Sequence, residues 1–252
     1  MTKKARTVTA YVLSLAFILV LWIVLSLAVH ADLILPGPGK VFKALAGLLK
    51  SPAFYKAFAH TFLRVFVSFI ISVIAGTLIG ILCGLSPFAR DFFELPLAII
   101  RATPVVAFIL IALFWFKSGT VPVFVGVLMT LPIMITAVTN GFYKSDEKLQ
   151  GMAQAFCLSK KQIFRYIQLP SLVPFFMNGM LSTFGLTWKV IAAGEVLSLP
   201  KNATGTLLQR AQVHLETPSV IAITIVLVAV SFVIERIFVA AVNKYLKNRE
   251  KR

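Results

Sequence analysis

Residues 65–89, VFVSFIISVIAGTLIGILCGLSPFA, contain no Asp, Glu, Lys or Arg. A helix needs about 20 apolar residues to cross the core of a bilayer, so this run predicts a membrane-spanning helix. Five further uncharged runs, most of which approach or exceed that length, cover residues 7–31, 102–116, 118–143, 166–188 and 217–234. The short alternating segments typical of a membrane β-barrel are absent. The predicted fold class is therefore an all-α integral membrane protein with about six transmembrane helices.

The composition agrees with this fold class. Of 252 residues, 59% are hydrophobic and 13% are charged, whereas about a quarter of a soluble domain is charged. We predict one transmembrane domain over residues 1–252, with a kink at Pro104 in the third span. The first run exceeds the h-region of a signal peptide, so we expect a retained helix. The six spans are predicted at about 7–29, 60–85, 93–116, 121–143, 171–199 and 217–243.

The net charge of +16 raises the question of nucleic-acid binding. The basic residues, however, lie mostly at the edges of the apolar runs, where Lys and Arg set the orientation of a membrane protein. Fourteen of them lie on the side of the termini and of residues 144–170, against seven on the opposite side. We therefore expect both termini and a 144–170 loop in the cytoplasm, the lipid bilayer as partner and no nucleic acid.

Motifs for catalysis or cofactor binding are missing from the sequence. Residues 37–41, GPGKV, lack the first glycine and the Ser/Thr of a phosphate-binding loop. Three scattered histidines and two cysteines give no metal-ligand spacing. We expect no catalytic residue, no metal and no cofactor bound by this chain, and any energy must come from a partner.

The most informative stretch is the polar insertion at residues 151–174, GMAQAFCLSKKQIFRYIQLPSLVP. Two short helices are expected there, the second with Ile163, Phe164 and Ile167 on one side and basic residues on the others, ended by Leu169-Pro170. Such a helix–turn–helix can dock into a groove on a cytosolic partner. It can equally lie on the membrane surface, held by the same basic residues, and the pattern leaves both interpretations open.

This stretch resembles the EAA loop of the permease subunits of ABC importers. Gly151, Met152 and Cys157 depart from the family pattern. Other stretches resemble the nitrate, sulfonate, taurine and bicarbonate importer permeases, namely 33–41 (LILPGPGKV), 101–104 (RATP), 114–116 (FWF) and 186–195 (LTWKVIAAGE). The coupling residues that the resemblance implies are Ala153, Cys157, Ser159, Lys160, Gln162, Phe164, Arg165, Leu169 and Pro170.

The resemblance implies a type I importer subunit in a bacterial plasma membrane. Such a subunit forms the solute pathway by pairing with a second permease, here expected as a homodimer. Two ATPase copies, which hold ATP and Mg, drive it, and an external substrate-binding protein delivers the solute. The alternative is an ATPase-independent secondary transporter, although the inverted repeats that would favour it are not found. An intramembrane enzyme would need a catalytic pair, and none is present.

Four residues of the apolar spans are candidates for the translocation pathway: Arg101, Trp188, Lys189 and Glu195. Charges in a bilayer are costly and need partners or water. Each charge could instead be neutralised by carbonyls or another helix, and Trp188 could be an interfacial anchor. Lys189 and Glu195 are six residues apart, so we expect no pairing within their helix. For Arg64, at the start of the second span, snorkelling to the interface is a sufficient explanation.

Overall fold

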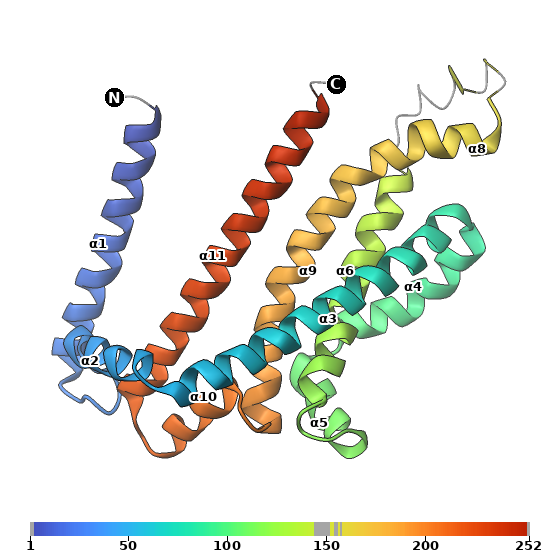
Figure 1. The fold of residues 1–252 in the computed structure, drawn as a ribbon. Helices are drawn as coiled ribbons and strands as arrows, with labels where there is room; N and C mark the ends of the chain where they lie inside the picture. The colour runs from blue at the N-terminus through green and yellow to red at the C-terminus, as the bar shows by residue number, and fades with distance from the viewer. Residues whose placement is uncertain (1–2, 144–151, 154–155, 157, 251–252) are drawn as a thin grey trace. The chain divides into compact units, whose positions relative to one another are not determined.

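The computed structural model describes residues 3–143, 152–153, 156 and 158–250, which form helices and no strand (Figure 1). The elements are α1 (Lys3–Val29), α2 (Pro38–Leu49), α3 (Pro52–Leu85), α4 (Pro87–Ala102), α5 (Val105–Trp115), α6 (Val121–Tyr143), α8 (Lys160–Ile163), the π-helical segment η1 (Phe164–Gln168), α9 (Leu169–Ser198), α10 (Thr204–Val213) and α11 (Thr217–Glu250).

Five helical stretches are long and apolar enough to cross a membrane, and the pair α4 and α5 makes a sixth if it counts as one span. These findings confirm the prediction of about six spans in an all-α protein. The five stretches are Thr9–Val29, Pro52–Leu85, Val121–Tyr143, Phe164–Ser198 and Thr217–Val242.

The third predicted span, residues 93–116, is not one kinked helix. Helices α4 and α5 bend by 101° at the break between them. Pro104 lacks an N–H and disfavours a helical conformation in the residue before it. Thr103 is accordingly extended, with φ −80° and ψ 130°, and its N–H and hydroxyl both donate to the carbonyl of Ile99. Proline chemistry therefore produces a full break where the sequence predicted a kink.

The chain forms two compact units. The first consists of Met1–Lys56 and Leu207–Val228. Within it, two side chains of α1 hold the turn that follows this helix. Trp22 Nε1 donates to the backbone carbonyl of Pro36 at 3.1 Å, and Ser26 Oγ donates to that of Leu35 at 3.2 Å. Pro38 then starts α2, and Val41 is buried. The LPGPGKV stretch is thus a turn followed by a helix start.

The second unit consists of Ala57–Thr206 and Ala229–Arg252. In it, three glycines spaced four apart on α3 allow close packing against large side chains spaced four apart on α6. Gly76 faces Met134, Gly80 faces Val138 and Gly84 faces Phe142. A Cβ on Gly80 would lie 2.7 Å from that of Val138, closer than real Cβ atoms approach. Small residues commonly permit such close approach of membrane helices.

Helices α6 and α9 run side by side and form the centre of this unit (Figure 1). Gly179 of α9 lies so near α6 that a Cβ there would be 2.5 Å from that of Ala137. Val125 and Val190 join the two helices in a buried cluster with Ile109 of α5. This packed pair positions the polar side chains described next.

Candidate functional site

A groove that carries several polar side chains lies between α4, α6 and α9. It consists of two adjoining hollows with volumes of about 470 and 380 Å³, and Arg101, Thr136 and Asn140 line both. Arg90, Glu94 and Thr139 also line the first hollow, whereas Asn178 and Ser182 also line the second. We call these eight residues the α4–α6–α9 groove.

Arg101, a predicted pathway residue, sits where the two hollows meet. It is exposed in the last turn of α4, and its Nη1 lies 3.4 Å from Thr136 Oγ1. Among the described residues, no carboxylate lies within ion-pair distance of it. A cation is favourable at a helix C-terminus, but this guanidinium keeps donors that can bind an anionic group in the groove.

Lys189 lies on the face of α9 that also carries the groove residues Asn178 and Ser182. Asn178, Ser182 and Lys189 are spaced four and seven residues apart, which places them on one helical face. Lys189 is exposed, one heptad beyond Ser182. It therefore extends the polar stripe of the groove toward the C-terminal end of α9.

Trp188 and Glu195 lie on a different face of α9, which packs against α3. Trp188 is only 4% exposed, and its ring lies 6.2 Å from that of Phe58 and 6.3 Å from that of Phe62, centroid to centroid. Glu195 follows seven residues later and has no exposed surface. The structure thus places Arg101 in the groove and separates Trp188 and Glu195 from it. Lys189 does not line either hollow and shares only the helical face of Asn178 and Ser182.

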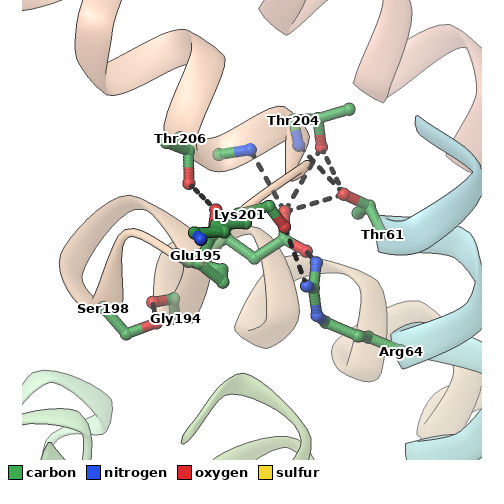
Figure 2. Close-up of polar contacts among 10 residues, drawn as sticks. Thr61, Arg64, Gly194, Glu195, Ser198, Lys201, Thr204 and Thr206 are labelled. Atoms are coloured by element: carbon green, nitrogen blue, oxygen red, sulfur yellow. Dashed lines mark hydrogen bonds and ion pairs between the residues drawn. The ribbon is translucent and has the colours of Figure 1, made fainter. Parts of the chain in front are cut away.

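The carboxylate of Glu195 is held by four donors (Figure 2). Arg64 Nη1 donates to Oε1 at 2.8 Å. Oε2 accepts from Thr61 Oγ1 at 2.8 Å, from the Gly205 N–H at 3.1 Å and from Thr204 Oγ1 at 3.4 Å. The pairing partner of Glu195 is therefore Arg64, not Lys189, and snorkelling is not a sufficient explanation for Arg64 because its side chain pairs with a buried carboxylate.

The turn between α9 and α10 is held by the same ion pair of Arg64 and Glu195. Arg64 Nη2 donates to the carbonyl of Lys201 at 3.3 Å, a contact visible beside Glu195 in Figure 2. Leu199 and Asn202 both adopt left-handed backbone angles, with φ of 51° and 52°. Gly205 comes so close to α9 that a Cβ on it would lie 2.5 Å from the Cβ of Glu195.

The predicted coupling segment, which the structure describes from residue 158 to residue 170, has a reciprocal cap at the start of its helix. The backbone N–H and the hydroxyl of Ser159 both donate to Gln162 Oε1 at 2.8 Å, and Ser159 Oγ accepts from the Gln162 N–H at 3.4 Å. This arrangement is the capping box that an S-x-x-Q sequence favours. Ala153 is buried, whereas Gly151 and Cys157 lie outside the described residues.

Leu169-Pro170 does not end the coupling helix, contrary to the prediction. Helix α8 continues through η1 directly into α9. Pro170 cannot donate to the preceding turn, and a π-helical segment is one way in which a helix accommodates such an irregularity. Phe164 of η1 stacks on Phe142 of α6, with ring centroids 6.1 Å apart. Residues 160–168 and α9 are therefore one helical body, and η1 contacts α6.

Sequence reasoning named Arg101 and missed the other seven groove residues, including all five uncharged ones. Thr136 and Asn140 on α6, and Asn178 and Ser182 on α9, are pairs of polar residues four apart in otherwise apolar helices. That spacing is a helical-face signal that could have found them. Among the described residues, no three His, Cys, Asp or Glu side chains gather as a metal site.

The comparisons with known proteins agree with one another. Residues 76–247 match the family model described as "Binding-protein-dependent transport system inner membrane component". The chain is 25% identical over 240 residues to the taurine transport system permease protein TauC of Escherichia coli, covering 92% of this chain and 86% of that protein. It is 28% identical over 115 residues to the nitrate import permease protein NrtB of Synechococcus elongatus, covering 45% and 41%.

Two solved structures share the fold. An amino acid ABC transporter crystallised with histidines superposes with a TM-score of 0.66 at 17% identity, over 81% of this chain and 97% of that one. The inward-facing MetNI methionine ABC transporter gives 0.56 at 16% identity, over 75% and 93%. The chain thus belongs to the inner membrane component family of binding-protein-dependent transport systems, as a type I ABC importer permease of the nitrate and taurine type and a multi-pass protein of the bacterial inner membrane.

Proposed function

We propose that this permease forms one half of an ATP-driven pathway for a small solute. A second copy of the chain supplies the other half, two ATPase copies bind ATP and Mg, and an external binding protein delivers the solute. Both termini and residues 144–170 face the cytoplasm, as the fourteen-to-seven distribution of basic residues favours.

One observation carries the coupling part of the proposal. The capped start at Ser159 is continuous through η1 with α9, and α9 contributes Asn178 and Ser182 to the groove. A helix transmits displacement along its axis because its turns are hydrogen-bonded to one another. A partner ATPase that moves α8 would therefore move the groove wall.

The groove itself fits the inner part of a solute pathway. It extends from Asn140, near the end of α6, to Ser182 in the middle of α9, with Arg101 between the two hollows. Arg101 and Lys189 together give this side a positive potential, which favours a solute with a sulfonate, nitrate or similar anionic group. The names of the relatives, a taurine and a nitrate permease, agree with such a solute.

A co-purification tests the assembly. The chain is expressed with its cognate ATPase and binding protein and captured through a tag after Arg252. We expect a complex with two ATPase copies, which Arg165→Glu in the coupling segment disrupts. Lys43→Glu, an exposed charge reversal in α2, is the matched control and should leave the complex intact.

The opposite result would favour the alternative function. A monodisperse permease that retains no ATPase under any nucleotide condition would point to a secondary transporter. An intact complex in Arg165→Glu would mean that the coupling segment is not the docking site.

A further inference from the structure

The carboxylate of Glu195 is hydrogen-bonded by donors from this same chain. Its carboxylate has no exposed surface and accepts from Arg64, Thr61, Thr204 and Gly205. Thr61 and Thr204 are themselves buried, the Thr204 N–H donates to Thr61 Oγ1 at 3.0 Å, and the Thr204 hydroxyl shares its one proton between Thr61 Oγ1 at 3.0 Å and Glu195 Oε2 at 3.4 Å. A solute could reach this carboxylate only by displacing donors that already compensate its charge.

The contacts join three separate segments. Thr61 and Arg64 belong to α3, Glu195 to α9, and Thr204 and Gly205 to the first turn of α10. Arg64 also bonds the carbonyl of Lys201 and so ties the turn between α9 and α10 to α3. Figure 2 shows Thr61, Arg64 and Thr204 converging on the Glu195 carboxylate.

We propose that these residues form a latch that stays closed in every step of the transport cycle, so that α3, the C-terminal end of α9 and residues 199–206 move as one body. The latch consists of Thr61, Arg64, Glu195, Thr204 and Gly205. Glu195 is then a positioning residue and does not bind solute, in contrast to its predicted pathway role. The solute path runs along the other face of α9, past Lys189.

The closed state follows from the cost of opening. Separating the segments would leave a carboxylate and a guanidinium in apolar surroundings, where removing one partner of a buried ion pair is strongly unfavourable. It would also break the hydrogen bonds that Thr61, Thr204 and Gly205 donate from buried positions. Gly205 allows the close approach on which all these contacts depend.

Cysteine accessibility tests the latch without knowledge of the solute. In a background with Cys83→Ala and Cys157→Ser, Thr204→Cys is probed with a maleimide in the ATPase-bound complex. Labelling is compared between the nucleotide-free and vanadate-trapped states. We expect Thr204→Cys to stay unlabelled in both, whereas the exposed neighbour Lys201→Cys labels in both. A tenfold rise in labelling of Thr204→Cys in either state would overturn the proposal.

A disulfide provides the second measurement. The hydroxyl oxygens of Thr61 and Thr204 are 3.0 Å apart, so a Thr61→Cys, Thr204→Cys pair can be cross-linked. The oxidised complex should hydrolyse ATP, with the binding protein present, at a rate within about twofold of the same reduced protein. A tenfold loss on oxidation that a reductant restores would show that the latch must open.

Substitution of Glu195 separates positioning from folding. In the Thr204→Cys background, Glu195→Gln keeps an acceptor oxygen and should leave the introduced thiol protected, whereas Glu195→Ala should expose it in both states. Protection in Glu195→Ala would mean that Glu195 does not hold the turn. The latch proposal rests on the proposed function only because the comparison needs two nucleotide states of the ATPase. If no ATPase binds, the proposed function fails. Labelling of the isolated permease then still decides whether Glu195 holds the turn.

Discussion

Arg64 and Glu195, 131 positions apart in the chain, form an ion pair with 2.8 Å between Nη1 and Oε1. The carboxylate is fully buried, and the Arg64 side chain is 14% exposed. The pair explains how two charges are tolerated within apolar helices, because each compensates the other and further donors complete the carboxylate. One face of α9, with Trp188 and Glu195, packs against α3, and another face, with Asn178 and Ser182, lines the groove.

Removing this pair should destabilise the permease. Glu195→Ala leaves Arg64 and the Thr61 hydroxyl without their acceptor, and loss of one partner of a buried pair costs about 3 kcal/mol. We expect a clearly lower Tm of the detergent-purified protein, and a smaller decrease for Glu195→Gln. Lys201→Ala is the control, since only its backbone carbonyl contacts Arg64. Equal Tm values for the parent protein and Glu195→Ala would contradict a stabilising pair.

The contact between α3 and α6 should not tolerate an added methyl group. Gly80→Ala would place a Cβ 2.7 Å from that of Val138, and overpacking of this kind costs about 1–3 kcal/mol. Gly185→Ala on α9 meets no atom within 4 Å and should keep or raise the Tm, because alanine favours a helix by about 1 kcal/mol over glycine. The prediction fails if the two variants melt alike.

Loss of the capping box should loosen the start of the coupling helix. Ser159→Ala together with Gln162→Ala removes the three reciprocal contacts, and a lost N-cap costs about 1 kcal/mol. We expect faster hydrogen exchange at residues 160–168 and weaker ATPase retention. Ser171→Ala, whose hydroxyl bonds the Ile167 carbonyl inside the helix, serves as the control. Unchanged exchange would show that the cap does not order this helix.

The two faces of α9 should respond differently to substitution. We expect Lys189→Met to reduce solute uptake at least about tenfold, equivalent to about 1.4 kcal/mol, with assembly unchanged. Lys189→Arg, which keeps the charge, should retain more uptake than Lys189→Met. Uptake is measured in proteoliposomes with the cognate binding protein.

The neighbouring residue provides the control for that experiment. Trp188→Phe should leave uptake nearly unchanged, because the ring packs on Phe58 and Phe62 and its buried Nε1 has no partner among the described residues. Unaffected uptake in Lys189→Met would exclude Lys189 from the pathway. A loss in Trp188→Phe equal to that in Lys189→Met would contradict the separation of the two faces.

Several features could be read from the sequence because they depend on local composition. Long uncharged runs predict spans whatever their neighbours are. The cap at Ser159 and Gln162 was not predicted, although the S-x-x-Q spacing is a local signal for it. The EAA-like stretch and the residues around Pro36 led to the family for the same reason. Each of these signals is complete within a few tens of residues.

The chain by itself therefore determined an all-α membrane protein of about six spans and its importer-permease family, and it predicted where a coupling segment would lie. Only the tertiary structure decided that Arg64 pairs with Glu195, that Arg101 joins two hollows and that Trp188 faces away from Lys189. These relationships depend on which helices pack together and at what rotation. That arrangement is set by contacts between segments far apart in sequence, such as glycines of α3 against α6.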